Sequence, residues 1–535
     1  MNDWKPPFEP VLDLADIQGI AVPGFLKPHQ TLLYLRMCDK FDFSAFRKFL
    51  IDLDVATGSR TLIDRRAARK EKDVSQRSGN RQVVLTAIAF TYAGLLKLVP
   101  SAMEIPSVAF KHGMVRRSGL LGDPADPASE GNPRNWVVGG VDAELDAMIV
   151  VAGDTRTGVS AHAAYLLAKL TELGMLVELE NGDIRPDLPG HEHFGFDDGI
   201  SQPGIRGRAS AQNDDFITPR YLDPGEVPAV WLYGYPGQDL VWPGELILGY
   251  PATSPDPLLP GPIAQCGPTW TRNGTFLVYR RLRQDVVAFW TTMRDEAKRL
   301  AALPGFAGMT DVRLASLLVG RWPSGAPVAR TPGQDLPDLG QDPLSNNSFL
   351  LDVDTPDWKL STSVTRTFPL AKADPAGLIC PVAAHIRKVN LRDSSSDLGG
   401  ATTNQTRRIF RVGIPFGAPL PETARYGEAP DPVSGKRGLL FLSIQTSLEE
   451  QFEFLQARWI NDDTRPKMPG GHDMIVGQNG ATERGVRRCS VFADFAQAQV
   501  SASAQFVIPT GGAYLFVPSL STLRHVIGGS SAWTA

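Results

Sequence analysis

The sequence is poor in the residues that build small metal sites and disulfide frameworks. Only 4 cysteines and 8 histidines occur among its 535 residues. The cysteines lie far apart and form no CxxC pair, which argues against a zinc knuckle and against a disulfide-stabilised scaffold; they are Cys38, Cys266, Cys380 and Cys489. Any chemistry based on histidine must therefore draw on a very short set of side chains.

The sequence also lacks an excess of charge of one sign and a long hydrophobic run. Its 54 basic and 58 acidic side chains give a net charge of −4, which offers no general attraction to nucleic acid or to an anionic membrane. The longest apolar stretch, residues 83–96, is interrupted by Thr86, Thr91 and Gly94 and is too short to cross a bilayer. The N-terminal segment shows no basic or apolar region of a secretory signal. We therefore expect a cytoplasmic protein with no nucleic-acid or membrane partner.

The remaining composition is that of a folded protein. Hydrophobic residues make up 42% and charged residues 21% of the chain, and glycine (51) with proline (43) stays under a fifth of it, so extensive disorder is not expected. The length exceeds what one hydrophobic core usually serves. We predict two domains, residues 1–215 and 216–535.

Hydrophobic patterns predict the same order of elements in each half. In the first half we expect strands over 30–37, 82–90, 145–152 and 175–180, with helices over 42–54 and 160–173. The first of these helices carries a periodic apolar face that consists of Phe43, Phe46, Phe49, Leu50 and Leu53. Strand, helix, strand, strand, helix, strand is the order of a ferredoxin-like unit.

The second half repeats that order. Strands are predicted over 275–280, 407–413, 438–445 and 513–517, and Val286 to Leu300 follow a helical period. Ser447 and Glu450 form a capping box that opens a second helix, which runs to about Trp459. The sequence thus predicts an α+β fold of two ferredoxin-like domains. Long loops rich in Gly, Pro, Asp and Ser, over 118–134, 188–219 and 320–362, are expected to carry function.

The densest group of chemically active residues is HEHFGFDDGISQPGIRG, over residues 191–207. Three interpretations compete. The segment is a turn, since Asp-Gly and Pro-Gly are common turn dipeptides. Alternatively, His191 and His193 share one face of a strand and bind a metal together with Asp197 or Asp198. In the third interpretation a carboxylate stands beside a cofactor, which the flanking glycines allow the backbone to approach closely.

Two further segments carry candidate residues. His385 lies in a small-residue, apolar run and is followed by Arg387, Lys388 and Arg392. It is either a buried histidine near a basic surface or an axial ligand of haem iron, with nearby cations for the haem propionates. In RRIFRVGIPFG, over 407–417, Arg411 shares a strand face with Ile409 and Arg407. If Arg411 points into the protein, its charge must be paired with an anion. Alternatively, the segment is an edge strand whose arginines lie in solvent.

Together these three segments resemble the dye-decolourising peroxidase family of haem enzymes. The family's GxxDG signature corresponds to GFDDG at 195–199, followed by a similar ISQPG. Its proximal-histidine motif corresponds to AAHIRK at 383–388, and its arginine motif to RVGIP at 411–415. Weaker similarity extends the resemblance over most of the chain, at 17–19, 89–95, 243–250, 273–282 and 438–445.

The resemblance implies two ferredoxin-like domains, with one haem b per chain bound mainly by the C-terminal domain. It implies a peroxidase that reduces hydrogen peroxide and oxidises organic donors such as dyes and phenols in one-electron steps. His385 would be the axial ligand and Asp473 its carboxylate partner. On the other side of the haem, Asp198 would transfer the peroxide proton and Arg411 would stabilise negative charge. A homo-oligomer is compatible with this interpretation.

The resemblance also suggests residues around the haem and on electron-transfer routes. Phe416 stands where many relatives have a tyrosine that serves as a surface radical site. Trp459 resembles a redox-active tryptophan of some relatives, and a core contact, which we favour slightly, is its alternative. The remaining residues expected to contact haem are Arg387, Arg392, Gly199, Ile200, Ser201, Leu439 and Phe441.

Two other functions remain as alternatives. The first is a haem-binding or haem-handling protein without turnover, and the presence of both Asp198 and Arg411 gives it no support. The second is a non-haem metalloenzyme that uses His191 and His193. It would make the segments around His385 and Arg411 coincidental.

Overall fold

The structure is a computed structural model that describes residues 9–73, 81–362, 367–431, 436–482, 485–494 and 496–530. The first eight residues of the segment inspected for a secretory signal lie outside these ranges. The first half of the chain contributes four antiparallel strands in the spatial order β2-β3-β1-β4. Their bounds are β1 (His29–Met37), β2 (Val84–Phe90), β3 (Ala147–Gly153) and β4 (Met175–Asp183).

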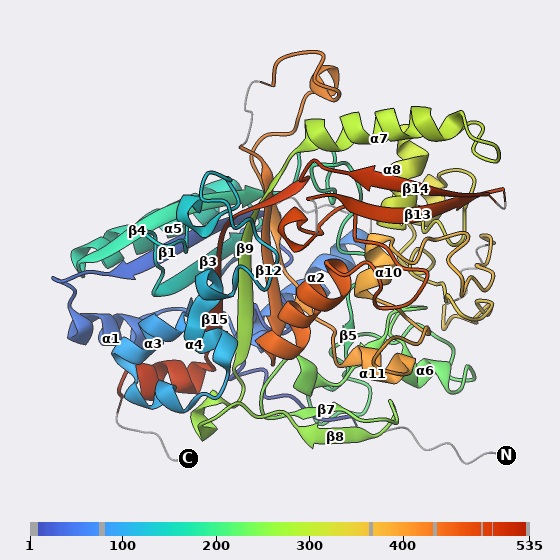
Figure 1. The fold of residues 1–535 in the computed structure, drawn as a ribbon. Helices are drawn as coiled ribbons and strands as arrows, with labels where there is room; N and C mark the ends of the chain where they lie inside the picture. Colours follow the sequence, from blue (N-terminus) through green and yellow to red (C-terminus); the bar gives the residue numbers. More distant parts are fainter. Residues whose placement is uncertain are drawn as a thin grey trace.

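The second half repeats this arrangement with the spatial order β10-β12-β9-β15. These strands are β9 (Thr275–Gln284), β10 (Phe410–Arg411), β12 (Gly438–Gln445) and β15 (Val507–Val517), and β11 (Ile414–Phe416) also pairs with β12. In both halves the strands therefore lie in the order second, third, first, fourth, which confirms the duplicated ferredoxin-like plan. The halves join where Phe516 of β15 pairs with Phe90 of β2, so one nine-stranded sheet crosses the molecule (Figure 1).

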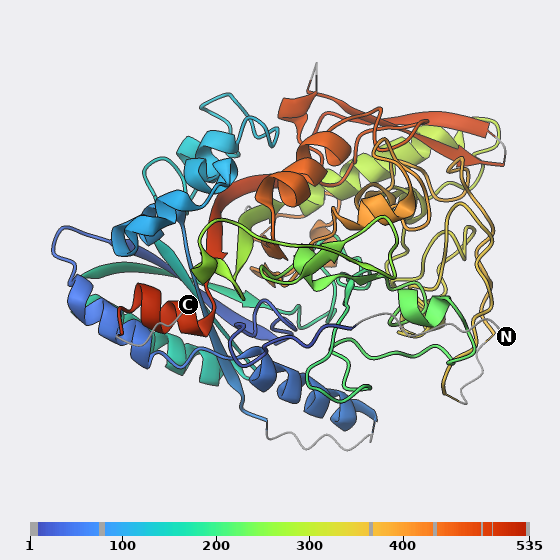
Figure 2. The same ribbon diagram turned by 90° about the horizontal axis from the view of Figure 1, so that it is seen from below.

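Helices cover one face of the N-terminal strands. The apolar side chains of α1 (Phe43–Asp52) and α5 (Arg156–Glu172) pack with alternate residues of β1 and β3 in one buried cluster. Phe46 and Leu50 of α1 are buried as predicted, whereas Phe43 is 42% exposed, because the first residue of the helix lies at the rim of the cluster. The C-terminal helical turn η9 (Thr522–Ile527) lies beside α1, as Figures 1 and 2 show.

The opposite face of the same strands is buried as well. Leu32 and Tyr34 of β1 belong to a second cluster that includes the irregular segment 12–25 and Leu62 of α2 (Gly58–Asp73). Every residue of β3 is buried, since both faces of the sheet are covered. This explains why its sequence is a continuous apolar run rather than an alternating one.

The C-terminal half adds a separate layer. In it α7 (Val286–Ala301) and α8 (Asp311–Val319) pack with the hairpin of β13 (Arg487–Ala493) and β14 (Ala496–Ala502), at the upper right of Figure 1. After β12 half of the predicted capping box is present, because Ser447 Oγ accepts a hydrogen bond from Glu450 N at 3.1 Å, whereas the Ser447 N–H donates to Gln451 Oε1 at 2.9 Å and not to Glu450. The helix that it opens is a wide π-type helix in two parts, η6 (Leu448–Glu453) and η7 (Leu455–Ile460).

The predicted loops are long and irregular, with only short elements inside them. The predicted strand over 407–413 is shorter than expected, because Arg407 lies outside the ladder and only Phe410 and Arg411 pair in β10. The remaining α-helices and β-strands are α3 (Tyr92–Leu98), α4 (Val108–Arg117), α6 (Ala229–Leu232), α9 (Pro337–Gly340), α10 (His385–Val389), α11 (Ala401–Gln405), β5 (Gly204–Ile205), β6 (Leu240–Val241), β7 (Pro251–Thr253) and β8 (Pro260–Ile263).

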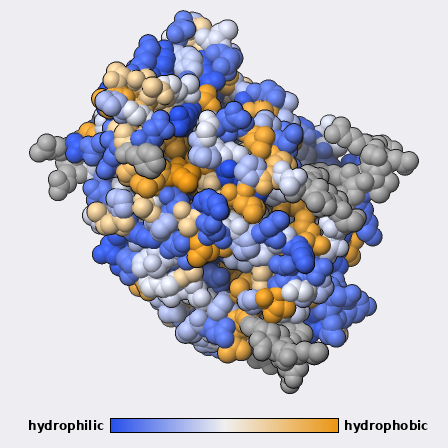
Figure 3. Space-filling model, turned by 90° about the vertical axis from the view of Figure 1, so that its right-hand side faces the viewer, coloured by the Kyte–Doolittle hydropathy of each residue, from blue (hydrophilic) through white to orange (hydrophobic). Residues whose placement is uncertain are grey.

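The surface seen in Figure 3 mixes hydrophilic residues with several small apolar groups. Within the described ranges, no helix has both the length and the apolar character needed to pass through a membrane.

Candidate functional site

A large cavity lies against the C-terminal part of the sheet. It contains about 1690 Å³ of space free of protein atoms, including its open mouth. Strands β9 and β12, helix α10 and the wide helix η6–η7 form its walls, and the loop from Glu192 to Ser201 contributes a further wall. Most of the wall is apolar, and its larger side chains include Ile386, Leu439, Phe441, Phe452, Leu455 and Ile475.

His385, the first residue of α10, lies on one side of the cavity with its ring 28% exposed. Its Nδ1 is 2.7 Å from Oδ2 of Asp473, which is fully buried. Oδ1 of Asp473 accepts the backbone N–H groups of Ile475 at 2.9 Å and Val476 at 3.0 Å. Since Nδ1 is engaged, Nε2 is the ring nitrogen left for a ligand in the cavity.

The charges of this pair stabilise each other. Burial acts to raise the pKa of Asp473, but the charge and hydrogen bond of His385 and the two backbone N–H groups outweigh it, so the pKa of Asp473 is lowered. Burial acts to lower the pKa of His385, but the charge of Asp473 and its hydrogen bond outweigh burial, so the pKa of His385 is raised. The carboxylate therefore holds the ring oriented, with its proton on Nδ1.

Asp198 and Arg411 form an ion pair in the cavity wall. Arg411 Nη1 donates to Asp198 Oδ1 at 2.6 Å, and the backbone N–H of Gly199 donates to the same oxygen at 2.6 Å. Burial acts to raise the pKa of Asp198, but the charge and hydrogen bond of Arg411 outweigh it and the pKa is lowered. Gly199 has a φ of +90°, and a Cβ there would meet no atom within 4 Å, so the backbone leaves open space beside the carboxylate.

His385 and the Asp198–Arg411 pair act on each other electrostatically across the cavity lining. The charge of His385 lowers the pKa of Asp198, and the charges of Asp198 and Arg411 act in turn on the pKa of His385. The structure thus brings together the three residues that the sequence motifs singled out. The other expected residues that line the same cavity are Gly199, Ile200, Ser201, Leu439 and Phe441.

Two residues that support this site were not singled out from the sequence. Gln202 bonds to the backbone of Arg411 twice, through Nε2 to the carbonyl oxygen at 2.7 Å and through Oε1 from the N–H at 3.2 Å. Arg321 donates to Ser201 Oγ at 2.9 Å and to the carbonyl oxygens of Gly325 and Asn346, both at 2.7 Å. Gln202 lies within the ISQPG motif, but only the structure shows what its side chain contacts.

The prediction that Arg387 and Arg392 contact haem is corrected by their placement, since neither lines the cavity. Arg387 is buried against Asp374, whose carboxylate it meets at 3.2 Å, and it also donates to the Cys380 carbonyl at 2.7 Å. Arg392 lies over the ring of Phe349 at 3.5 Å. The helix that carries His385 is only five residues long and packs inward, so its cations point away from the cavity.

Lys388 also points inward, and it supports the loop that carries Asp473. Its Nζ donates to the carbonyl oxygens of Asp462, at 2.7 Å, and Gly471. Arg408 does reach the cavity wall. Within the described residues only its Nη1 donates, to Asp239 at 2.9 Å and to Asn390, so its other N–H groups remain for an anion.

His191 and His193 do not form the predicted pair on a strand, because this segment contains only an isolated bridge between His191 and Asp197. Both ring nitrogens of His191 lie near carbonyl oxygens, those of Pro189 at 3.1 Å and Pro323 at 3.0 Å. His193 Nε2 donates to the Phe416 carbonyl at 2.9 Å. No cluster of three or more His, Cys, Asp or Glu suited to a metal ion occurs in the described part of the chain. The described residues therefore give the non-haem alternative no ligand set.

The two aromatic positions singled out from the sequence are buried. Trp459 is 1% exposed, packs with Leu391 and Leu455, and donates through Nε1 to Asp397 at 3.0 Å. This agrees with the core contact that the sequence favoured. Phe416 is also buried, with the guanidinium of Arg281 4.2 Å from its ring centre.

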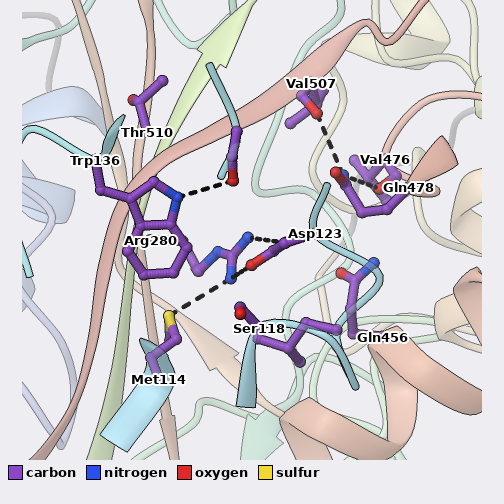
Figure 4. A network of polar contacts seen from close by, with 12 residues as sticks. Met114, Ser118, Asp123, Trp136, Arg280, Gln456, Val476, Gln478, Val507 and Thr510 are labelled. Carbon is purple, nitrogen blue, oxygen red and sulfur yellow. Dashed lines mark hydrogen bonds and ion pairs between the residues drawn. The ribbon is translucent and has the colours of Figure 1, made fainter. Parts of the chain in front are cut away.

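One wall of the cavity contains a buried ion pair. Arg280 of β9 donates to both carboxylate oxygens of Asp123, at 2.7 and 3.0 Å (Figure 4). Its guanidinium also lies over the ring of Trp136, 5.4 Å from the centre. Gln456 and Gln478, which are drawn beside this pair in Figure 4, line the cavity together with Arg280.

Comparisons with known proteins found relatives over nearly the whole chain. A family model described as the DyP dimeric alpha+beta barrel domain matches residues 16–186. A dye-decolorizing peroxidase of Mycetinis scorodonius is 31% identical over 96% of this chain and 88% of its own length. A multifunctional dye peroxidase of an Amycolatopsis species is 28% identical over 94% of both proteins. The solved structure of an ancestral D-type dye decolorizing peroxidase is 30% identical, with a TM-score of 0.73 over 97% of this chain and 99% of that one.

Proposed function

This chain belongs to the dye-decolourising peroxidase family, and we propose that it holds one haem b in the cavity between His385 and the Asp198–Arg411 pair. Peroxidases of this family are haem enzymes that act as oxidoreductases. The observation that carries the proposal is the cavity itself, whose lining includes both a carboxylate-bound histidine and a carboxylate–guanidinium pair.

The residues present fit a haem. An imidazole whose Nδ1 is bound to a buried carboxylate, and whose Nε2 is left for a ligand, is the donor that haem iron requires. The walls are mainly apolar, as a porphyrin ring requires, and Leu439 and Phe441 face it from one strand. Arg408, with N–H groups left over, would bind a propionate in place of Arg387 and Arg392.

The roles of His385 and Asp473 follow from their hydrogen bond. His385 would bind iron through Nε2, and Asp473 would accept the Nδ1 proton. An imidazole that donates to a carboxylate is a stronger electron donor, and such a ligand favours the more oxidised states of the iron.

Asp198 and Arg411 would manage the proton of hydrogen peroxide on the opposite side. Bound haem would supply the iron at which the O–O bond of peroxide is cleaved and the store for two oxidising equivalents. Asp198, kept ionised by Arg411, accepts a proton from one peroxide oxygen and returns it to the other, which leaves as water. Arg411 stabilises the negative charge that develops as the O–O bond lengthens.

We further propose small organic reductants, dyes and phenols, as the electron donors, each oxidised by one electron. Relatives known as dye-decolorizing and dye peroxidases support dyes as donors, and phenols are proposed from the family resemblance. A domain boundary near residue 215 and a cytoplasmic location remain proposals from the sequence. All four cysteines are free, which suits a reducing compartment.

The experiment is a dye assay with the purified holoenzyme. An anthraquinone dye should lose colour only when hydrogen peroxide is present, and Asp198→Asn should slow the peroxide step while the bound haem remains. Asp187→Asn, which removes a carboxylate paired with Arg185 outside the cavity, is the control. Full activity in Asp198→Asn would refute the assignment of the proton-transfer residue.

A further inference from the structure

A buried tyrosine behind the cavity wall is hydrogen-bonded to a buried carboxylate. Tyr514 of β15 is 1% exposed, and its hydroxyl donates to Glu453 Oε1 at 2.9 Å. The side chain of Glu453 is 3% exposed and is held by two hydrogen bonds from Arg117, at 2.5 and 2.9 Å. Arg117 extends toward the surface, with a quarter of its side chain exposed. The three residues form a chain from the phenol to the solvent side of the protein.

Aromatic rings connect Tyr514 to the cavity. The ring of Phe452, which lines the cavity, is 6.3 Å from the ring of Tyr514, centre to centre and nearly perpendicular to it. Phe441, on the same wall, is 6.1 Å from Phe452. Tyr514 is therefore one ring removed from the space that the haem would occupy.

The surroundings of Tyr514 allow its proton to leave only together with an electron. Burial and the charge of Glu453 raise the pKa of Tyr514 well above its usual value, so the phenol stays protonated at neutral pH. Loss of an electron makes a phenol strongly acidic, and a carboxylate already at hydrogen-bond distance accepts the proton without rearrangement. Arg117 compensates the charge of Glu453 before the transfer.

Among the contacts of the described residues, the other tyrosines lack this combination of a carboxylate acceptor and a ring contact to the cavity wall. Tyr34 also donates to a carboxylate, Glu180 Oε2 at 3.1 Å, but its ring neighbour is Tyr279, which does not line the cavity. Tyr250 donates to an amide oxygen, that of Asn273. An amide accepts a proton far less readily than a carboxylate.

We propose that Tyr514 is a redox site of this protein, which supplies an electron to the oxidised cofactor when no external reductant is present. The phenol loses one electron to the cofactor and its proton to Glu453, which leaves a neutral tyrosyl radical and a protonated carboxyl group. The return of the electron, and of the proton from Glu453, restores the phenol once a reductant reaches the cavity. This inference rests on the proposed function, because the peroxide reaction supplies the oxidising equivalents.

The test uses the holoenzyme, hydrogen peroxide and no reductant, followed by rapid freezing and electron paramagnetic resonance. Protein with ring-deuterated tyrosine identifies a tyrosyl radical by its narrowed spectrum. We expect this radical in the wild type, its loss in Tyr514→Phe, and its retention in Tyr34→Phe, the matched control. Glu453→Gln should also abolish it, because the phenol remains but its proton acceptor does not.

Peroxide consumption and the haem spectrum are recorded on the same samples. If peroxide is consumed and no tyrosyl radical forms, or if Tyr514→Phe keeps the wild-type signal, the inference is wrong while the proposed function stands. If Tyr514→Phe fails to bind haem, the inference is tested instead by peptide mapping of the peroxide-treated wild-type protein. Oxidised tyrosine at position 514 supports the inference, and its absence there overturns it.

Discussion

Replacing Arg411 by leucine tests the electrostatic part of the proposed mechanism. At the observed separation of 2.6 Å, a pair of unit charges interacts by about 1.6 kcal/mol in bulk water and by about 6 kcal/mol at an effective dielectric constant of about 20. The side chains of Arg411 and Asp198 are 28% and 34% exposed, so solvent screening places the value between these limits, at roughly 3 kcal/mol. If Arg411 acts on the developing charge at a similar distance, Arg411→Leu should slow the peroxide step by roughly 100-fold.

The assay is stopped-flow measurement of the reaction between haem-loaded protein and peroxide across the acidic pH range. In the wild type the rate should persist at acidic pH, because Arg411 lowers the pKa of Asp198, and it should fall only where that carboxylate becomes protonated. In Arg411→Leu the acid limit should move to higher pH, since burial then acts on Asp198 without the opposing cation. Arg407→Leu, which removes an arginine paired with the exposed Glu450, is the control. Equal rates and equal acid limits in the wild type and Arg411→Leu would refute the reasoning.

Three further outcomes follow from the contacts. Asp473→Asn should weaken haem binding or activity by about 10- to 100-fold and raise the haem reduction potential. Asp463→Asn, at an exposed carboxylate, is the control and should change neither. An unchanged spectrum and an unchanged potential in Asp473→Asn would contradict the role of Asp473 in orienting His385. Asp123→Ala should lower the free energy of unfolding by about 3–5 kcal/mol in urea denaturation, because it leaves the buried charge of Arg280 unpaired, and the double variant Asp123→Leu/Arg280→Met should recover much of the loss. Asp198→Asn should remove the acid limit of the peroxide step altogether, and a retained limit would assign it to another group.

Much of the fold was predictable because its strands carry strong local signals. The runs that form β1, β3 and β12 are apolar enough to be recognised alone, and their repeated order with helices identifies the ferredoxin-like plan. The hairpin β13–β14 was missed because the buried positions of its strands hold mainly small or polar side chains, although buried and exposed residues alternate along both strands. Helix α2 was missed because it is highly charged and contributes few side chains to the core.

The residues of the candidate site were likewise predictable only in part. His385, Asp198 and Arg411 were singled out because their three motifs occur together and in order, as in the family that the sequence resembles. Each motif alone left a structural alternative open. Arg387 was misplaced because spacing along the chain does not show the direction of a side chain on a five-residue helix. Gln202 was missed because its function depends on the Arg411 backbone, 209 residues away in the sequence.

The proposed haem site is tested most directly by the absorption spectrum of the purified protein with and without haem b. Wild-type protein reconstituted with haem b should show a Soret band that corresponds to one haem per chain. His385→Ala should lose this band or show a strongly shifted one, and added imidazole should restore the wild-type spectrum by filling the space of the missing ring. His191→Ala, which alters a histidine outside the cavity lining, should retain the wild-type spectrum. A full, unshifted Soret band in His385→Ala would contradict the assignment of the iron ligand and the mechanism built on it.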